Sequence, residues 1–252
     1  MDRERLGRNL IFLDEVDSTN SYATQLLKNV KPEEGTIVYC ARQTDGRGQR
    51  GNGWNSQPNC NLTMSMILYP GYLNLKNQHY LYQIAALACY DTIAEYLNPG
   101  QFDIRIKWPN DILINRKKVC GILIENHIME NQIQSSVCGI GMNLNQIDFS
   151  GLERASSLRR FTGKDQDVKT TLYRLCELYE SYYHMLRNSD LDTIRRKYET
   201  LLFGLSDWNR FQSGDLIQEF KVVGLDDSGF IQLEDRKGSL FSAGIKELTW
   251  LY

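Results

Sequence analysis

Apolar and polar residues alternate along the first hundred positions in patterns that predict strands and helices in turn. A short strand is expected over residues 10–13, and apolar residues at helical spacing predict a helix over residues 18–29. A strand over residues 36–41 follows. Apolar residues at every second position of 62–68 predict a half-buried strand, and the pattern over 80–97 predicts an amphipathic helix.

The middle of the chain is rich in β signals. Four successive strands are expected over residues 103–108, 111–115, 119–125 and 133–143. The Asn115-Arg116-Lys117 segment is typical of the turn of a hairpin. This part of the sequence therefore predicts a mixed or antiparallel sheet.

Helical spacing returns in the last third of the chain and then gives way to short strands. A long helix is expected around residues 172–182 and a second one over 190–202. After them come three short strands separated by turns rich in Asp and Gly, over residues 216–223, 229–233 and 239–243. We interpret this tail as a small β-barrel and expect two domains, residues 1–206 and 207–252.

The composition is that of a folded globular protein. The chain has 252 residues, of which 42% are hydrophobic, and this excludes collagenous, low-complexity and wholly disordered chains. No run approaches the roughly 18 apolar residues that cross a bilayer, and the N-terminus lacks the apolar stretch of a secretory signal. We expect a cytoplasmic protein without a membrane partner. The six widely spaced cysteines are expected to be buried thiols without a role in chemistry.

Positive charge is concentrated in two segments of an otherwise slightly acidic chain. Lys plus Arg number 29 against 31 Asp plus Glu, a net charge of −2. Residues 40–54 carry three arginines against one aspartate, and residues 105–118 carry five basic residues against one aspartate. A nucleic-acid binder would spread positive charge over a face and raise the pI well above 6.0. The pattern favours binding of a compact anion such as a nucleotide phosphate.

The first of these segments, residues 43–54, combines four glycines with two arginines. Glycine lets backbone N–H groups turn toward a ligand, and arginine is a planar donor for carboxylate or phosphate. The segment matches neither a P-loop nor a dinucleotide fingerprint, so a solvated surface loop is an equal alternative. Because long loops in compact domains are often functional, we expect it to order on ligand binding.

The second segment places Lys118 at the start of a buried strand with Gly121 three residues on, where one ammonium could lie beside a ligand. A solvated hairpin tip is the alternative. Trp108 is more typical of a core, and Asn110-Asp111 of a turn. Residues 18–20, Ser-Thr-Asn, are typical of a helix N-cap.

Five motifs, in this order, resemble those of the biotin protein ligases. They are Asp17-Ser18-Thr19-Asn20, the Gly/Arg segment 43–54, Lys107-Trp108-Pro109-Asn110-Asp111, Lys118-Val119-Cys120-Gly121-Ile122-Leu123-Ile124-Glu125, and Gly139-Ile140-Gly141-Met142-Asn143-Leu144. The resemblance implies an α+β fold: a class II aminoacyl-tRNA-synthetase-like catalytic domain with a mixed sheet flanked by helices, plus a small SH3-like C-terminal barrel.

The resemblance also implies a reaction in two steps. Biotin and ATP, with Mg²⁺, would give biotinyl-5′-AMP and pyrophosphate, and a lysine of a biotin carboxyl carrier protein would then displace AMP. The alternatives are a lipoate or octanoate ligase of the same fold and a non-catalytic biotin sensor. A homodimer paired through an exposed edge strand is a further expectation.

Roles for individual residues follow from the resemblance alone. Lys118 and Arg47 are the expected catalytic residues, and no metal ligand is assigned. The expected biotin-binding residues are Ser18, Thr19, Asn20, Gln43, Arg47, Gly48, Gln49, Lys118 and Gly121. The expected ATP-binding residues are Arg50, Asn52, Trp54, Asn110, Asp111, Lys118 and Asn143.

The sequence departs from the pattern of the ligases in two places. Gln49 and Asn52 stand where many bacterial members have arginine, which bears on how well the adenylate is retained. Only about nine residues precede the first expected strand, whereas bifunctional members have a DNA-binding winged helix there. We therefore expect ligase activity without DNA binding.

Overall fold

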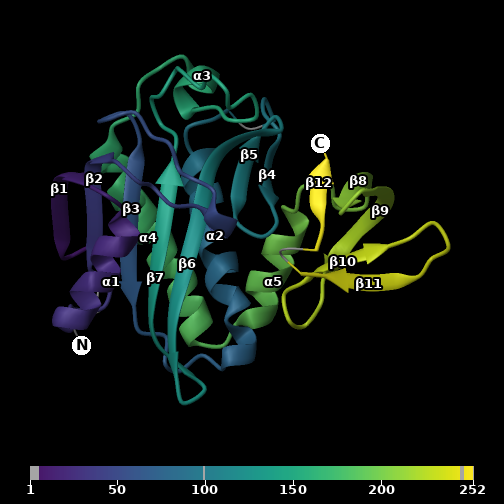
Figure 1. The fold of residues 1–252 in the computed structure, drawn as a ribbon, viewed down its shortest axis with the longest axis horizontal. Coiled ribbons are helices and arrows are strands. Elements are labelled where there is room, and N and C mark those ends of the chain that lie inside the picture. The colour runs from purple at the N-terminus through teal and green to yellow at the C-terminus, as the bar shows by residue number, and fades with distance from the viewer. Residues whose placement is uncertain (1–5, 99, 245–246, 252) are drawn as a thin grey trace.

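A seven-stranded sheet and a five-stranded sheet form the framework of the protein, which is seen here as a computed structural model (Figure 1). The structure describes residues 6–98, 100–244 and 247–251, without the side chain of Arg50. The larger sheet pairs β1 with β2 in parallel and all its other neighbours antiparallel. Its strands, in spatial order, are β1 (Leu10–Val16), β2 (Ile37–Gln43), β3 (Leu62–Leu68), β7 (Gln132–Met142), β6 (Lys117–Met129), β5 (Asp111–Ile114) and β4 (Ile104–Lys107).

Helices cover both faces of the large sheet. Helix α1 (Thr19–Asn29) packs on one face through a small cluster that includes Ala23, Val38 and Ile67. Helices α2 (His79–Ala94), α4 (Val168–Arg187) and α5 (Leu191–Thr200) pack on the other. The expected mixed sheet flanked by helices is therefore confirmed.

Strand β3 lies at the centre of this arrangement and is buried at all seven positions. The prediction of a half-buried strand was wrong, because α1 covers one face while α2 and α4 cover the other. The prediction of an amphipathic α2 was wrong for a related reason. This helix lies between the sheet, α4 and α5, and eleven of its 16 residues are buried.

The hairpin between β5 and β6 turns where the sequence predicts. Asn115 and Arg116 have φ of 48° and 65°, and this pair of left-handed residues is the geometry that suits the twist of a two-residue hairpin. The turn brings Lys118 back alongside Leu113 of β5.

The C-terminal residues form a five-stranded antiparallel sheet of their own. Its strands, in spatial order, are β11 (Leu240–Ala243), β10 (Ile231–Glu234), β9 (Leu216–Leu225), β8 (Trp208–Ser213) and β12 (Thr249–Leu251). The sequence predicted three of them and missed β8 and β12. Strand β8 has a single fully buried position and β12 only three residues, so neither has a readable apolar alternation. The boundary at residues 206 and 207 stays a prediction.

Several hydrogen bonds and ion pairs join this small sheet to the rest of the molecule, among them the Leu225 N–H to Glu199 Oε1 at 3.0 Å. The indole Nε1 of Trp108 donates to the carbonyl of Gly229 at 3.0 Å. Arg195 of α5 forms an ion pair with Asp227 at 2.9 Å. The small sheet is thus held against the segment that follows β4 (Figure 1).

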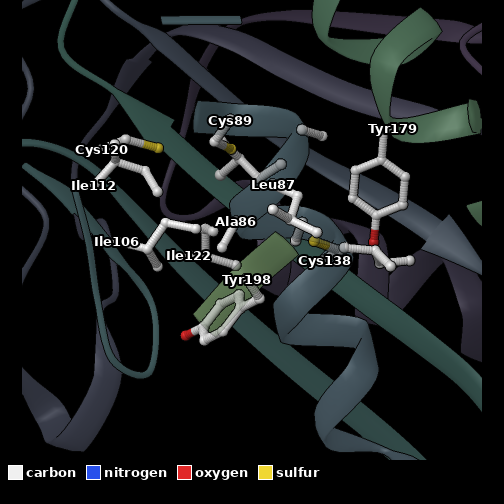
Figure 2. Packing of buried hydrophobic residues seen from close by; sticks show 14 of the residues in the cluster. Ala86, Leu87, Cys89, Ile106, Ile112, Cys120, Ile122, Cys138, Tyr179 and Tyr198 are labelled. Atoms are coloured by element: carbon white, nitrogen blue, oxygen red, sulfur yellow. The ribbon is translucent and has the colours of Figure 1, made fainter. Parts of the chain in front are cut away.

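Five of the six cysteines are buried as the sequence predicts, whereas Cys60 is partly exposed. Cys89, Cys120 and Cys138 lie among apolar side chains, and Cys138 lies beside Tyr179 (Figure 2). Burial raises the pKa of the Cys138 thiol to about 12, so this thiol stays protonated at neutral pH.

The fold also contains short helices: η1 (Gln49–Gly51), η2 (Leu75–Asn77) and α3 (Leu158–Thr162). Helix α3 was not predicted from the sequence. Within the described ranges, none of the helices has the length and apolar character needed to cross a membrane.

Candidate active site

A pocket lies on the face of the large sheet that also carries α1, beyond the N-terminus of that helix. It is lined by Ser18, Thr19, Asn20, Gln43, Arg47, Gly48, Gln49, Trp54, Thr63, Met64, Asn110, Lys118, Gly121, Ile122, Leu123, Gly139, Ile140 and Gly141. The lining comes from five segments that are far apart in the sequence. The register of three central strands, β3, β7 and β6, brings them together.

Two rows of paired residues form the floor of this pocket. Ser65, Gly139 and Leu123 lie side by side in one row. Two residues further along each strand, Thr63, Gly141 and Gly121 form the other. Residues two apart on a strand point to the same face, so the two rows share one floor. We name the space over Gly139 the polar end and the space over Gly141 the cationic end.

The polar end is built on the first turn of α1. Ser18 is the N-cap residue, and its side chain accepts from the backbone N–H of Ser21. The backbone N–H of Thr19 donates to Gln43 Oε1 at 2.8 Å, and the Thr19 hydroxyl lies 3.1 Å from the same oxygen. Ser18 and Thr19 are each only 3% exposed. Ser18 caps the helix as the sequence predicts, whereas Thr19 is its first residue, and both also face the pocket.

Asn20 extends this polar network across the sheet. Its Nδ2 donates to Glu125 Oε2 at 2.7 Å and to the Leu123 carbonyl at 3.3 Å, and its Oδ1 lies 2.5 Å from Ser65 Oγ. A Cβ at Gly139 would lie 2.2 Å from Asn20 Oδ1. Only glycine at position 139 therefore leaves room for the amide of Asn20.

The Gly/Arg segment folds back on itself above the pocket. The Gly48 N–H donates to the Asn52 carbonyl and the Trp54 N–H to the Gly46 carbonyl, each at 2.7 Å. Arg47 and Gly53 also pair as an isolated antiparallel bridge. The prediction of a loop is confirmed, and this loop has a hairpin-like tip.

Trp54 lies over the cationic end. A Cβ at Gly141 would lie 2.3 Å from its indole ring, and one at Gly121 would lie 3.1 Å from it. The indole Nε1 is buried and has no hydrogen-bond partner among the described residues. A buried donor of this kind is costly unless a ligand satisfies it.

Two lysines and a carboxylate complete the cationic end. Lys118 Nζ lies 2.7 Å from Asp111 Oδ1, and Lys107 Nζ lies 3.8 Å from Asp111 Oδ2. The Lys118 ammonium also lies 5.6 Å from the centre of the Trp54 ring. Lys118 therefore points into the pocket, whereas its neighbour Lys117 is exposed and donates to the Glu153 carbonyl.

Two side chains hydrogen-bond to the edge of β6 beyond the first residue of β5, Asp111. Asn110 Nδ2 donates to the Ile122 carbonyl at 2.7 Å. The Tyr82 hydroxyl donates to the Ile124 carbonyl at 3.1 Å, and burial raises its pKa. The same hydroxyl also meets the side chain of Gln49. This contact ties the tip of the loop to α2.

The arrangement suits a ligand with a neutral polar part and an anionic part. The polar end provides buried hydroxyl and amide groups, and Arg47 and Lys118 provide cations. Charged donors in a partly water-excluded site stabilise developing negative charge. A carboxylate could therefore meet a phosphate between these two cations.

Comparison with known families decides what the chain is. Residues 12–143 match the model of the Biotin/lipoate A/B protein ligase family. The chain belongs to this family. The matched residues include all the strands that form the floor of the pocket.

Individual members of the Biotin/lipoate A/B protein ligase family resemble most of the chain. The bifunctional ligase/repressor BirA of Bacillus spizizenii is 34% identical over 249 residues, which cover 96% of this chain and 75% of that protein. The biotin–[acetyl-CoA-carboxylase] ligase of Paracoccus denitrificans is 30% identical, with 90% of this chain and 94% of that protein covered. The Aquifex aeolicus biotin protein ligase, solved with biotin and ATP, is 28% identical with a TM-score of 0.80, covering 97% of this chain and 99% of that one.

The family resemblance predicted from the motifs is confirmed, and so is the fold class that it implied. All nine residues expected to bind biotin line the pocket. Of the residues expected to bind ATP, Trp54, Asn110 and Lys118 also line the pocket, while Asp111 lies behind Lys118.

The other three residues expected to bind ATP are Asn52, Arg50 and Asn143. Asn52 belongs to the loop tip, and the side chain of Arg50 lies outside the described part of the chain. Asn143 is buried beyond the end of β7, where its Nδ2 donates to the Ser156 carbonyl and its Oδ1 has no partner among the described residues.

Several residues of the site were not assigned from the sequence. Thr63, Met64, Ile122, Leu123, Gly139, Ile140 and Gly141 also line the pocket. The two glycines of the Gly139-Ile140-Gly141 motif were a usable signal, because glycines two apart on a strand clear one face. Ser65 and Glu125 carried no such signal, since their role depends on strand register.

Proposed function

We propose that this protein is an ATP-dependent biotin protein ligase. It activates the biotin carboxylate as biotinyl-5′-AMP with release of pyrophosphate, and it transfers the biotinyl group to a lysine of a biotin carboxyl carrier domain. The named biotin–[acetyl-CoA-carboxylase] ligase of Paracoccus and the Aquifex ligase with bound biotin and ATP support this function. Neither comparison favours a lipoate ligase or a sensor.

One observation carries the proposal: a single pocket joins a buried neutral polar end to a cationic end. Ser18, Thr19 and Gln43 form the first. Lys118, beside Trp54, forms the second. Biotin has the same division, with a neutral cyclic urea at one end and a carboxylate at the other.

We assign the roles at the biotin side from this match. Ser18, Thr19 and Gln43 hydrogen-bond the cyclic urea, whose buried donors and acceptors must be satisfied. Arg47, with the backbone of Gly48 and Gln49, closes over the carboxylate. Because the two reacting groups are both anions, these donors also bring them together before they react.

Lys118 is the proposed catalytic cation. Its ammonium bridges the biotin carboxylate and the α-phosphate and stabilises the charge that builds as the oxygen attacks phosphorus. Asp111 holds this ammonium at 2.7 Å in the structure. That contact positions Lys118 before the substrates arrive.

The nucleotide is proposed to occupy the cationic end. Trp54 lies near the adenine, and Asn110, Asp111, Asn143, Asn52 and Arg50 lie on the nucleotide side. Mg²⁺ enters with ATP, and the oxygens of Asp111 and Asn143 are of the type that it prefers, together with phosphate oxygens. The orphaned Oδ1 of Asn143 is consistent with such a partner.

The remaining partners stay predictions. Gln49 and Asn52 are neutral at the two positions where many bacterial ligases have arginine. We therefore propose that the loop retains the adenylate less tightly than it would with arginines there. The net charge of −2 argues against DNA binding. A homodimer through an exposed edge strand and a cytoplasmic location are also proposed, and light scattering of the purified protein tests the first.

A transfer assay tests the proposed function. The protein is incubated with ATP, Mg²⁺, a purified carrier domain and radiolabelled biotin or lipoate, and label on the carrier is measured. We expect biotin on the carrier, with pyrophosphate release that requires biotin. Transfer of lipoate alone would establish the lipoate ligase, and binding of biotin without pyrophosphate release would establish the sensor.

A further inference from the structure

Glu125 belongs to none of the roles described so far, although its carboxylate lies at the edge of the pocket. It lies on β6, and its Oε2 accepts from Asn20 Nδ2 at 2.7 Å. The same oxygen lies 3.6 Å from Arg47 Nη2. Glu125 therefore contacts both the polar end and the loop.

The hydrogen bonds that begin at Glu125 can run in only one direction. The Glu125 carboxylate at 2.7 Å and the Leu123 carbonyl at 3.3 Å both accept and do not donate, so the amide of Asn20 presents its NH₂ group to them and its Oδ1 to Ser65. Ser65 Oγ lies 2.5 Å from that Oδ1 and 2.8 Å from Thr19 Oγ1. Since Oδ1 is an acceptor only, the single hydroxyl hydrogen of Ser65 is committed to Asn20.

This direction passes on to the residues that face the ligand. With its hydrogen committed, Ser65 can only accept from Thr19, whose hydroxyl has two acceptors in reach, Ser65 Oγ at 2.8 Å and Gln43 Oε1 at 3.1 Å. Donation to either acceptor leaves the Thr19 oxygen with lone pairs for a ligand N–H. Gln43 Oε1 accepts from the Thr19 backbone N–H at 2.8 Å. Gln43 Nε2 is then the atom that can donate to a ligand carbonyl.

We propose that Glu125 is a positioning residue that, together with the Leu123 carbonyl, fixes the direction of the buried hydrogen-bond chain Glu125, Asn20, Ser65, Thr19. It thereby sets whether the Thr19 hydroxyl offers a lone pair to the cyclic urea of biotin, beside the donor that Gln43 provides. The proposal rests on the proposed function, because it assigns the urea to the polar end.

Burial is what gives this direction its effect. Asn20 and Thr19 are 3% exposed and Ser65 is fully buried, so water cannot compensate for a hydrogen bond that points the wrong way. The amide of Asn20 is also held against Gly139, which leaves it little room. Reversing the Asn20 amide would leave its oxygen facing two other acceptors, the Glu125 carboxylate and the Leu123 carbonyl.

Two substitutions break the chain at different points. Glu125→Gln keeps the shape but can present either an oxygen or an NH₂ group to Asn20, so that only the longer contact with the Leu123 carbonyl, at 3.3 Å, still enforces the direction. Ser65→Ala removes the middle link and leaves the ion pair between Glu125 and Arg47 intact. Glu219→Gln is the matched control, because Glu219 pairs with Arg236 at 2.8 Å on an exposed strand of the small sheet.

Calorimetric titration without ATP measures the effect on biotin and on desthiobiotin, which keeps the cyclic urea. We expect each single variant to weaken binding of both ligands by roughly tenfold, because a buried polar group is left mispaired. The double variant should lose no more than either single variant, because both act through one chain. The KM for ATP of Ser65→Ala, at saturating biotin, should stay unchanged.

The outcomes separate the two proposals. Wild-type affinity for both ligands in Glu125→Gln and Ser65→Ala, or losses that multiply in the double variant, would overturn the role of Glu125. A wild-type protein that binds neither ligand would instead refute the proposed function itself. Melting temperatures equal to that of Glu219→Gln exclude a general loss of folding.

Discussion

The two ends of the pocket are built in opposite ways. At the polar end, the side-chain polar atoms of Asn20 are hydrogen-bonded within the protein, and Ser18, Thr19 and Ser65 beside it are almost completely buried. At the cationic end, the Lys118 side chain is 32% exposed and the Trp54 Nε1 has no partner among the described residues. Arg47, on the loop between them, is 43% exposed.

This difference indicates two ways of recognising a ligand. A polar end whose hydrogen bonds are already made loses little conformational entropy on binding and selects the neutral ring by its pattern of donors and acceptors. The cationic end has an indole N–H without a partner among the described residues and a loop whose hydrogen bonds are mainly internal. This end therefore gains its contacts from the ligand. The first end therefore determines which acid binds, and the second determines whether it reacts.

The largest expected effect comes from removing the cation of the reacting end. Lys118→Ala should slow adenylate formation by about 10²- to 10³-fold, because charge that builds on the phosphate loses its fixed partner. Asp111 keeps Lys107 nearby, so stability should change little. The measurement is biotin-dependent pyrophosphate release, with the melting temperature recorded for each variant.

Lys117→Ala is the control for this experiment. Lys117 is the adjacent residue, carries the same charge and contacts only the Glu153 carbonyl among the partners described for its ammonium. Its loss should leave the rate unchanged. If Lys118→Ala lost activity only in proportion to a loss of folded protein, the cation would be structural.

The sequence predicted the elements of this site better than their burial. The apolar patterns located α1, β3 and the β5–β6 hairpin, because each pattern depends on neighbours within a few residues. They could not show that β3 is covered on both faces, since the covering helices α1, α2 and α4 come from elsewhere in the chain.

The motifs predicted which residues gather at the site but not how they are connected. Ser18, Gln43 and Lys118 were found through family resemblance, and the structure places them around one pocket. Ser65 and Glu125 are connected to Asn20 across 45 and 105 residues of sequence. Such contacts depend on strand register, which no local pattern contains.

Two neighbouring glycines allow the contrast between the ends to be tested on a single strand. An added methyl at Gly139 meets Asn20 and one at Gly141 meets Trp54, at 2.2 and 2.3 Å. Gly139→Ala should raise the Kd for biotin, and Gly141→Ala the KM for ATP, each on the order of tenfold, because the displaced group holds a different ligand. Titration with biotin and steady-state kinetics in ATP measure the two constants.

Gly71→Ala is the control for both glycine variants. A Cβ there would meet the Ile133 carbonyl at an ordinary 3.7 Å, far from the pocket. A raised Kd for biotin in Gly141→Ala, equal to that in Gly139→Ala, would show that the two ends are not independent.

The smallest effect is expected in the ligand-free protein, where no activity is lost. Amide hydrogens of residues 44–54 should exchange faster than those of β3 and β7, because the loop makes few hydrogen bonds outside itself while those strands are paired on both sides. Addition of biotin and ATP should slow exchange in the loop and leave β3 unchanged. Exchange of the loop as slow as that of β3 before any ligand is added would mean that the cationic end is as preformed as the polar end.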